Sequence, residues 1–367
     1  MAESSDIYHD GRVLKEAYSL SSAGYNVIVY GFRNIGYKKT QYPFKIVTLP
    51  MVSKKYINFR KVSIIFNILI INILMLFKKA KVYHSHNTMF LPSMFFASRI
   101  HNATLVYDSH EVQWELNKIS EKIEKNFIKK AKYIINVSEG RGKEQIKRFN
   151  LFPNSMTIIS NYPEIPNSFS PISLEKNNKL SFVYSGGFDL YDNKLDNFII
   201  ALKDFKECNF YLLAFGYGDS LFKLKKLIKD YKLESQVKFL PLVKPSEVIS
   251  VIEKFDIAVN LLTNPKNLIS YKYHGINKVY EYLIAGLPIL CSNMPSFITD
   301  FENNNIGKSV DPYDIESIKK GIQFFIHKKD ELHKIKIRAR NIAISDFNWK
   351  SQEKKLLQLY NNNICAE

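Results

Sequence analysis

The stretch "NKVYEYLIAGLPILCSN", residues 277–293, joins a helical segment, a glycine and a short apolar run. Gly286 stands where a helix would end, and Pro288 follows where a strand would begin. In the helical part, Glu281 lies between apolar and aromatic neighbours. Burying a carboxylate is costly unless something pairs with it. Glu281 is therefore expected either to cap local structure or to hold a ligand.

Helical and extended patterns alternate on both sides of this stretch. A helical pattern from Asp10 ends at Gly24 and leads into a strand pattern, and later segments repeat this order. The alternation lapses between residues 161 and 179, which are rich in proline, serine and asparagine. Alternating strands and helices predict parallel sheets covered on both faces, so the predicted fold class is α/β with two Rossmann-like domains. The predicted ranges are 1–163 for the N-terminal domain, 164–179 for a linker, 180–345 for the C-terminal domain, and 346–367 for a final helix that packs back toward the N-terminal domain.

Length and composition agree with two domains in a reducing compartment. The chain has 367 residues, of which 46% are hydrophobic, and this length exceeds the usual size of one core. The three cysteines stand at unrelated spacings, which predicts neither a disulfide framework nor a zinc site. The first residues show no basic-then-apolar signal pattern, so we expect a cytoplasmic protein.

The chain is basic, with 52 lysines and arginines against 35 acidic residues and a net charge of +17. This charge indicates a polyanionic partner such as nucleic acid, anionic lipid or a phosphorylated small molecule. A basic bias spread evenly over the chain is equally explained by a solvated surface. Nucleic acid is the weakest of the candidates, because no segment combines lysines and aromatic residues in a recognisable reading motif.

One apolar run, residues 62–77, is the most membrane-like segment. It is about 16 residues long, shorter than the roughly 20 that span a bilayer, and it contains two asparagines. We therefore expect a buried or interfacial helix. Basic residues at both ends would suit a helix that lies against anionic headgroups.

Eight segments, taken in order, resemble the GT-B glycosyltransferases, specifically the large retaining family four, over nearly the whole chain. Each segment alone is weak evidence, but their common order is specific. The resemblance implies two domains facing a central cleft that binds a nucleoside-diphosphate sugar. The matching segments are "DGRVLKEAYSL…GYNVIVY", "VYHSHN", "LVYDSHE", "VYSGG", "LLAFGYGD", "VKFLPLV", "DIAVNLL" and "NKVYEYLIAGLPILCSN".

The resemblance also implies a donor site. In the family, the carboxylate that matches Glu281 accepts hydrogen bonds from the ribose hydroxyls of the donor, which would compensate its burial. A basic residue and a glycine turn hold the diphosphate. The nearest base to the second basic position is Lys194, although the alignment places Asn193 there. The donor-binding residues implied by the resemblance are Glu281, Lys278, Gly186, Gly187, Lys194 and Asn277.

His110 matches the family's histidine beside the transferred sugar, and it is the predicted catalytic residue. A neutral imidazole there could hydrogen-bond a sugar hydroxyl, while the alternative is a capping or core histidine. Arg12 and His86 are expected on the acceptor side. His84 and His86 alternate like a metal pair, but no third ligand is evident and no Asp-x-Asp motif ends a strand, so we expect no metal.

Two positions depart from the family pattern. Tyr273 stands where the family has a first glutamate, eight positions before Glu281, which concerns sugar recognition and activity. The apolar first strand expected before Asp10 is not evident in "MAESSDIY", so Asp10, Gly11 and Arg12 are expected to line the cleft differently.

The predicted function is metal-independent, retaining transfer of a hexosyl or N-acetylhexosaminyl group to a glycan or lipid-linked acceptor in bacterial surface polysaccharide assembly. The co-substrate is a nucleoside-diphosphate sugar, with a UDP-sugar favoured, and no cofactor is expected. The expected location is the cytoplasm, peripherally on the inner face of the plasma membrane. The alternatives are a catalytically inactive scaffold or binding subunit with the GT-B fold, and a nucleotide-sugar epimerase of the same fold.

Overall fold

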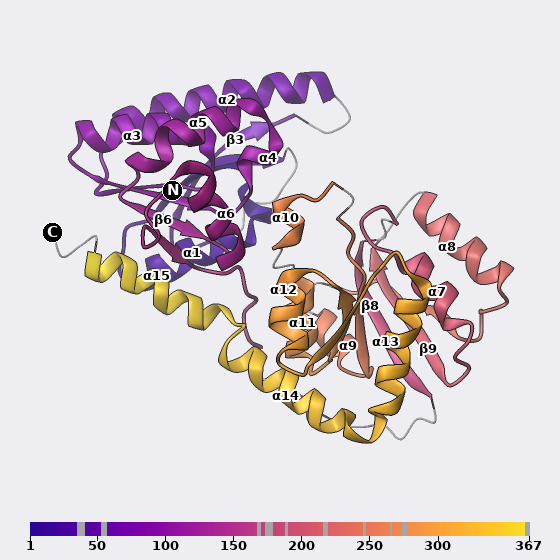
Figure 1. The fold of residues 1–367 in the computed structure, drawn as a ribbon. Coiled ribbons are helices and arrows are strands. Elements are labelled where there is room, and N and C mark those ends of the chain that lie inside the picture. Colours follow the sequence, from indigo (N-terminus) through magenta and orange to yellow (C-terminus); the bar gives the residue numbers. More distant parts are fainter. Residues whose placement is uncertain are drawn as a thin grey trace. The chain divides into compact units, whose positions relative to one another are not determined.

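The computed structural model forms two compact units, Met1–Asn161 with Gln352–Glu367, and Tyr162–Ser351 (Figure 1). The structure describes residues 1–34, 41–52, 57–166, 170–172, 179–187, 190–215, 219–244, 247–264, 266–273 and 277–363. Most of the predicted linker, residues 167–169 and 173–178, lies outside the described residues.

The first unit is built on a seven-stranded sheet of order β3-β2-β1-β4-β5-β6-β7. Every pairing in it is parallel. The carboxyl ends of its strands therefore lie at one edge, where open α/β sheets bind their ligands. The strands are β1 (Ala2–Asp6), β2 (Ile28–Asn34), β3 (Lys45–Met51), β4 (Val82–Ser85), β5 (Thr104–Ser109), β6 (Tyr133–Asn136) and β7 (Met156–Ile158).

The helices of this unit begin and end with local signals. Asp10 caps α1 by accepting a hydrogen bond from the backbone N–H of Val13, and Ser138 caps α6 in the same way. Asn150 ends α6 in the left-handed conformation, with φ of 51°. The helices are α1 (Gly11–Ser22), α2 (Ile57–Phe77), α3 (Leu91–Ile100), α4 (Gln113–Leu116), α5 (Lys118–Phe127), α6 (Glu139–Phe149) and α15 (Trp349–Asn363), which belongs to this unit from Gln352 onward.

The first strand is present, so the prediction that it is missing was wrong. β1 lies between β2 and β4, with the backbone N–H of Tyr30 donating to Met1 O at 2.9 Å and that of His86 donating to Ala2 O at 3.0 Å. Ladder bonds use backbone groups only, so a polar segment can occupy a central position when its side chains find partners. The prediction failed because it required an apolar run.

The second unit carries a six-stranded sheet of order β10-β9-β8-β11-β12-β13, again parallel throughout. Its strands are β8 (Leu180–Gly187), β9 (Cys208–Phe215), β10 (Val237–Phe239), β11 (Ile257–Asn260), β12 (Ile289–Ser292) and β13 (Gly307–Val310). Its helices are α7 (Leu195–Leu202), α8 (Asp219–Asp230), α9 (Val248–Ile252), α10 (Ile269–Lys272), α11 (Asn277–Ile284), α12 (Pro295–Phe297), α13 (Ile315–His327) and α14 (Leu332–Ser345).

The stretch of residues 277–293 forms α11, a turn and β12. Gly286 adopts φ of +77° at the turn, which glycine does without strain. Tyr282 is fully buried, and its hydroxyl accepts from the backbone N–H of Ser185 at 2.8 Å and donates to Ser185 O at 3.1 Å. These two bonds fix α11 against the end of β8, so Glu281 is carried on a helix anchored at a strand end.

The predicted class, α/β with two Rossmann-like parallel-sheet domains, is confirmed. The sequence patterns did not predict β3 or β13. Both are edge strands, and both are only partly buried, so neither carries the continuous apolar run of a central parallel strand.

Candidate active site

Six titratable side chains meet at the carboxyl ends of neighbouring strands in the first unit. They come from α1, from β4 and the residues after it, and from β5 and the residue after it. Five of them are at most 2% exposed, and the sixth, His110, has a side chain that is 12% exposed. We call this set the buried cluster: Arg12, Glu16, His84, His86, Asp108 and His110.

Arg12 and Asp108 form the centre of the buried cluster. Arg12 Nε donates to Asp108 Oδ2 at 2.7 Å and Nη2 donates to Oδ1 at 3.0 Å, a bidentate pair. Arg12 also donates to Ile159 O at 2.8 Å and lies 3.0 Å from Glu16 Oε1. Burial alone would raise the pKa of Asp108, but the Arg12 charge and the two nearest histidines hold that pKa well below its usual value. Asp108 is therefore ionised.

His110 connects the buried cluster to the surface of the unit. Its Nδ1 lies 3.6 Å from Asp108 Oδ2 and its Nε2 lies 3.9 Å from Glu3 Oε2. Burial would lower the pKa of His110, but the Asp108 carboxylate and the Glu3 charge outweigh burial and raise the pKa to about 9. The imidazole is thus a cation at neutral pH here, whereas the sequence analysis expected a neutral ring.

The other two histidines are buried and neutral. His86 Nδ1 lies 3.1 Å from Asp108 Oδ2, and His84 Nδ1 lies 2.7 Å from the hydroxyl of Tyr360 on α15. Burial lowers the pKa of both rings. Their Nε2 atoms approach Glu16 Oε2 at 3.7 and 4.0 Å, and neither Nε2 has a hydrogen-bond partner among the described residues. Burial raises the pKa of Glu16 to about 8, so Glu16 is mainly protonated at pH 7.

Burial also changes the role expected for Arg12 and His86. They are 2% and 1% exposed, and their polar atoms face the interior, so an acceptor at the surface would not touch them in this state. Both instead contact Asp108, which in turn lies beside His110. Arg12 and His86 therefore lie behind His110 and hold Asp108, which in turn positions the His110 ring.

Four members of the buried cluster carry atoms that could ligate a metal, because the ligand atoms of Glu16, His84, His86 and Asp108 lie within 4.8 Å of one another. The sequence analysis saw only the two histidines, since the carboxylates come from distant segments. Arg12 contacts both carboxyl groups and already supplies a positive charge beside them. The expected absence of a metal stays a prediction.

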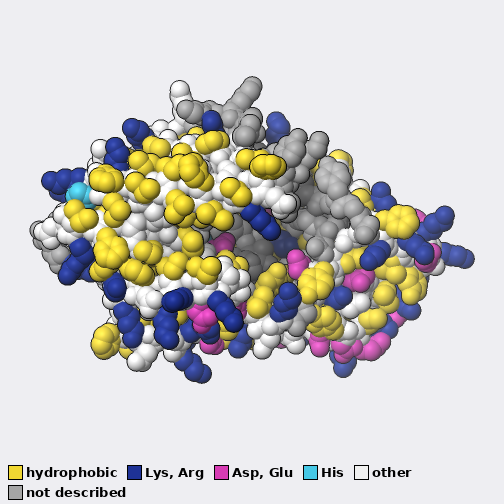
Figure 2. Space-filling view, turned by 90° about the horizontal axis from the view of Figure 1, so that it is seen from above, with side chains coloured by type: hydrophobic (Ala, Val, Ile, Leu, Met, Phe, Trp, Pro, Cys, Tyr) yellow, Lys and Arg dark blue, Asp and Glu magenta, His cyan; other side chains and the backbone are white. Residues whose placement is uncertain are grey.

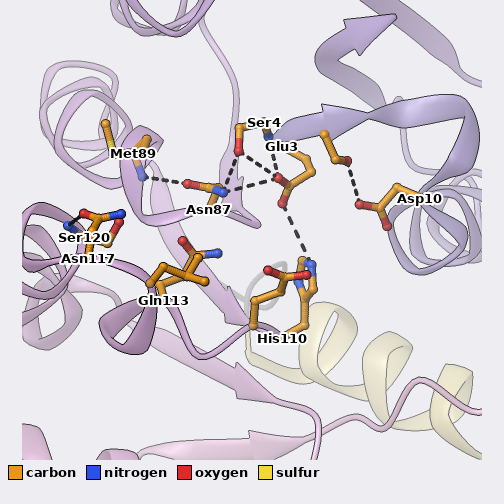
Figure 3. Close-up of a pocket in the computed structure, with 12 residues that line it drawn as sticks. Glu3, Ser4, Asp10, Asn87, Met89, His110, Gln113, Asn117 and Ser120 are labelled. Atoms are coloured by element: carbon orange, nitrogen blue, oxygen red, sulfur yellow. Dashed lines mark hydrogen bonds and ion pairs between the residues drawn. The ribbon is translucent and has the colours of Figure 1, made fainter. Parts of the chain in front are cut away.

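A cavity of about 300 Å³ opens beside His110 (Figure 3). Its wall carries three carboxyl groups, Glu3, Asp10 and Glu111, together with side-chain amides and hydroxyls such as Asn87. The described residues that line it include no lysine or arginine. Carboxylates and amide oxygens accept hydrogen bonds from hydroxyls and repel phosphates. The cavity therefore suits a hydroxyl-rich group such as a sugar ring.

Glu3, on β1, is the residue of this cavity that sequence reasoning missed. Its Oε1 accepts from Ser4 Oγ at 3.2 Å and from Asn87 Nδ2 at 3.4 Å, and its Oε2 faces His110 (Figure 3). Burial raises the pKa of Glu3 to about 8, although the His110 charge opposes the shift. Assigning residues 2–6 to a strand would have placed this carboxyl group at the edge of the sheet where His110 lies.

In the second unit, the structure brings together the predicted lysine and the predicted glycine turn. Lys278 Nζ donates to the hydroxyl of Tyr184 at 3.0 Å and lies 4.4 Å from the centre of that ring. The same Nζ lies 3.4 Å from the point where a Cβ would stand on Gly186, whose φ is +132°. Tyr184 donates in turn to Gly187 O at 2.7 Å. The end of β8 and the start of α11 thus form one polar corner.

Lys278 binds its proton less tightly than an exposed lysine does. Burial lowers the pKa of Lys278 to about 8, although the charges of Asp192 and Glu281 oppose the shift. Its hydrogen-bond acceptor is a neutral phenol. A second anion beside the ammonium would favour the charged form, so this corner is suited to bind an anionic group.

The remaining predicted donor residues are placed as follows. Glu281 is half-buried on α11, one turn after Lys278, and Asn277 is the exposed first residue of that helix. Lys194 precedes α7, and its Nζ lies 5.8 Å from the ring centre of Tyr313. The structure thus groups Glu281 and Asn277 with Lys278 on one helix and directs Lys194 toward a tyrosine.

Two side chains stand where the resemblance implies a charged residue, Asn193 in place of a base and Tyr273 in place of a glutamate. Asn193 is 6% exposed, and its Oδ1 has no hydrogen-bond partner among the described residues. Tyr273 follows α10, and Lys272 Nζ lies 5.2 Å from its ring centre. An aromatic ring and a lysine therefore stand where a carboxylate was expected.

Comparisons with known proteins agree with this architecture. Sucrose-phosphate synthase from Thermosynechococcus elongatus superposes with a TM-score of 0.72 at 14% identity, over 97% of this chain and 93% of that one. Anabaena Alr3699/HepE in complex with UDP gives a TM-score of 0.73 at 14% identity, over 98% of both chains. WaaG, a glycosyltransferase involved in lipopolysaccharide biosynthesis, gives 0.65 at 14% identity, over 96% and 95%. These structures have the two-domain GT-B fold, which is the class of this protein.

The sequence of the second unit also matches a known family. Residues 167–342 match the model of the family described as glycosyl transferases group 1. An uncharacterised glycosyltransferase, MJ1069 of Methanocaldococcus jannaschii, is 25% identical over 263 residues, which are 65% of this chain and 60% of the relative. The match thus spans about three fifths of that relative's length.

Proposed function

We propose that this protein transfers a sugar from a nucleoside-diphosphate donor to a glycan or lipid-linked glycan acceptor. The observation that carries the proposal is the polar corner of the second unit, where half-buried Lys278 lies against the glycine end of β8 on the same helix as Glu281. The family match supports it. A UDP-sugar is the favoured donor, because a structural neighbour was solved with UDP-glucose.

Each donor residue has a role that follows from its chemistry. Lys278 would bind the diphosphate, and Gly186 and Gly187 would let it approach the backbone closely. Glu281 would accept hydrogen bonds from the ribose hydroxyls. Asn277 stands at the amino end of α11, where the helix dipole favours a negative charge. Lysine and a helix end would then neutralise the leaving diphosphate, so we propose that the reaction needs no metal.

His110 is the proposed catalytic residue of the first unit. As a cation beside a cavity suited to hydroxyl groups, it would donate a hydrogen bond to a hydroxyl group of the sugar. Asp108, held in turn by Arg12, would fix the orientation of the ring. Retention of the anomeric configuration, assignment to family four, and a hexosyl or N-acetylhexosaminyl donor are parts of this proposal that rest on the resemblance.

The proposed setting is the assembly of a bacterial surface polysaccharide on the inner face of the plasma membrane, with the protein cytoplasmic and peripheral. Two observations support it. A structural neighbour, WaaG, is described as involved in lipopolysaccharide biosynthesis. In addition, α2 is apolar enough, by length and composition, to enter a membrane.

Two alternatives keep the fold but change the function. Tyr273 in place of the family's first glutamate favours an inactive scaffold or binding subunit. A nucleotide-sugar epimerase of the same fold would use the same donor site without any acceptor. The two alternatives differ from the transferase in whether donor is consumed and whether consumption needs an acceptor.

The test is acceptor-dependent release of UDP. The purified protein would be incubated with UDP-glucose or UDP-N-acetylglucosamine, with and without lipid-linked oligosaccharides extracted from bacterial membranes, and products would be separated by chromatography. A transferase releases UDP only when the extract is present. A new sugar nucleotide formed without the extract would identify an epimerase, and a donor that binds but is never consumed would identify a scaffold.

A further inference from the structure

One face of α2 exposes a continuous row of apolar side chains. They recur every three or four residues, so they lie on one side of the helix. The helix α3 packs against α2 and adds exposed Phe96 and Ile100, and Figure 2 shows hydrophobic side chains gathered across this face. The residues of α2, which we call the α2 stripe, are between 56% and 77% exposed: Phe59, Val62, Phe66, Leu69, Ile73 and Phe77.

The opposite face of α2 is packed into the first unit. Ile71 and Met75 are 1% and 3% exposed in the core. Asn67 Nδ2 donates to Pro50 O at 2.9 Å, and Asn72 Nδ2 donates to Met89 O at 3.2 Å. The helix has 21 residues and is thus longer than the predicted apolar run, yet only 17% of its most apolar window is buried. Crossing a bilayer would break its inner contacts, so only its outer face is available to a partner.

The positive charge of the chain is concentrated in the part of the sequence that contains α2 and α3. Residues 17–107 contain 12 lysines and arginines and no aspartate or glutamate, in a chain whose net charge is +17. The basic bias is therefore not spread evenly along the sequence. Exposed lysines at both ends of α2, Lys61 and Lys78, stand beside the α2 stripe.

We infer that the α2 stripe and α3 dock into the interfacial region of an anionic bilayer. The apolar side chains enter the boundary between headgroups and acyl chains, and the surrounding lysines contact lipid phosphates. Residues 17–107 carry positive charges and no acidic residue. This favours an anionic bilayer over a second copy of the chain, because pairing two such faces would bring like charges together. The inference specifies the surface of the peripheral location proposed above and does not require transfer activity.

The docked face is connected to the cavity beside His110. The short helix η2 (Thr88–Phe90) contacts both α2 and α5, and the carbonyl of Met89 accepts the hydrogen bond from Asn72. Met89 also lines the cavity. When α2 is docked on a membrane, it would thus lie directly behind the wall of the cavity. This consequence rests on the proposed function, since it places the site where a lipid-linked acceptor would reside.

The test is flotation of the full-length protein with vesicles of phosphatidylcholine alone or mixed with phosphatidylglycerol. The test variant is Phe66→Gln with Ile73→Gln, which removes apolar groups from the α2 stripe. The matched control is Phe152→Gln with Phe222→Gln, because these phenylalanines are 85% and 71% exposed and lie outside α2 and α3. Circular dichroism would check that both variants stay folded.

The inference predicts binding to the mixed vesicles that weakens with added salt, falls about tenfold or more in the test variant and is unchanged in the control. Equal loss in both variants, or no flotation of the wild type, would overturn it. So would a concentration-dependent dimer of the wild type that the test variant abolishes, since this would make the face a self-association surface. Donor binding, measured on the same samples, reports separately on the proposed function.

Discussion

The two units hold their functional groups in opposite ways. In the first unit, the groups of the buried cluster hold one another, because Asp108 contacts Arg12, His86 and His110 within 3.6 Å. In the second unit, half-buried Lys278 has the hydroxyl of Tyr184 as its hydrogen-bond acceptor and the backbone of Gly186 beside it. The first site is therefore internally compensated, whereas the second is suited to receive an anion.

This difference between the two units predicts where a substitution should lower stability and where it should weaken ligand binding. Removing one member of a compensated network leaves its partner buried without its counter-charge, which lowers stability. Burial already disfavours the charged form of the Lys278 amine. Removing this amine should therefore leave stability unchanged or raise it, and should weaken ligand binding instead.

Asp108→Asn should have the largest effect on stability. It leaves the Arg12 guanidinium buried without its bidentate carboxylate, which costs about 3–5 kcal/mol. Chemical denaturation followed by circular dichroism would measure the loss. The control is Asp204→Asn, which breaks a surface pair with Lys319 and should change stability by less than about 1 kcal/mol. Equal effects of the two substitutions would contradict the claim that the groups of the buried cluster compensate one another.

The stability of the first unit should fall between pH 6.5 and 9. The pKa of His110 is raised from 6.5 to about 9 in the folded protein, so its contribution is complete below pH 6.5 and is lost as pH rises through 9. The raised pKa of Glu3 acts in the same direction. The His110 part amounts to roughly 3 kcal/mol. Melting curves against pH should flatten in His110→Asn, and an equally steep fall in that variant would contradict the assignment.

Lys278→Met should weaken UDP binding by about tenfold to a hundredfold, the usual range for one charged hydrogen bond. Stability should stay unchanged or rise at pH 7, because the lowered pKa of Lys278 shows that burial disfavours the ammonium. Titration calorimetry and melting curves would measure the two quantities. The control Lys308→Met removes a lysine paired with Glu302 and should leave UDP affinity unchanged. A clear loss of stability in Lys278→Met would make this lysine a structural group.

Glu16→Gln should have the smallest effect, within about 1 kcal/mol at pH 7. The pKa of Glu16 is raised to about 8, so the residue is already mainly neutral and glutamine resembles its protonated form. Denaturation at pH 7 would compare it directly with Asp108→Asn, since both carboxyl groups contact Arg12. If Glu16→Gln destabilised as much as Asp108→Asn, Glu16 would have to be ionised.

Much of the second unit could be predicted from the sequence, because its signals are local. The helix, glycine and strand around Glu281 follow one another within seventeen residues, and the proximity of Lys278 to Gly186 follows from the order of a parallel sheet. The chemistry of the first unit was harder to predict. Arg12 and Asp108 are 96 residues apart in sequence, and no spacing rule shows that they form an ion pair or that Asp108 raises the pKa of His110.

The first strand was missed for a related reason. Its core position depends on backbone pairing with β2 and β4, while its side chains, Glu3 among them, are polar. Periodicity detects side-chain burial and not ladder bonds, so a polar central strand gives no signal. The concentration of charge in residues 17–107 was visible in the sequence, but it gained meaning only once α2 was seen to expose an apolar face.

The central claim is that the second unit binds a nucleoside-diphosphate sugar at Glu281 and Lys278. A thermal-shift screen of the purified protein with UDP, GDP, ADP and CMP, repeated with Glu281→Ala, tests it most directly. Since a ligand that binds only the folded state raises the melting temperature, UDP should stabilise the wild type, and this shift should disappear in the variant. Absence of stabilisation by every nucleotide in a folded wild type, or a shift that persists in Glu281→Ala, would contradict the claim.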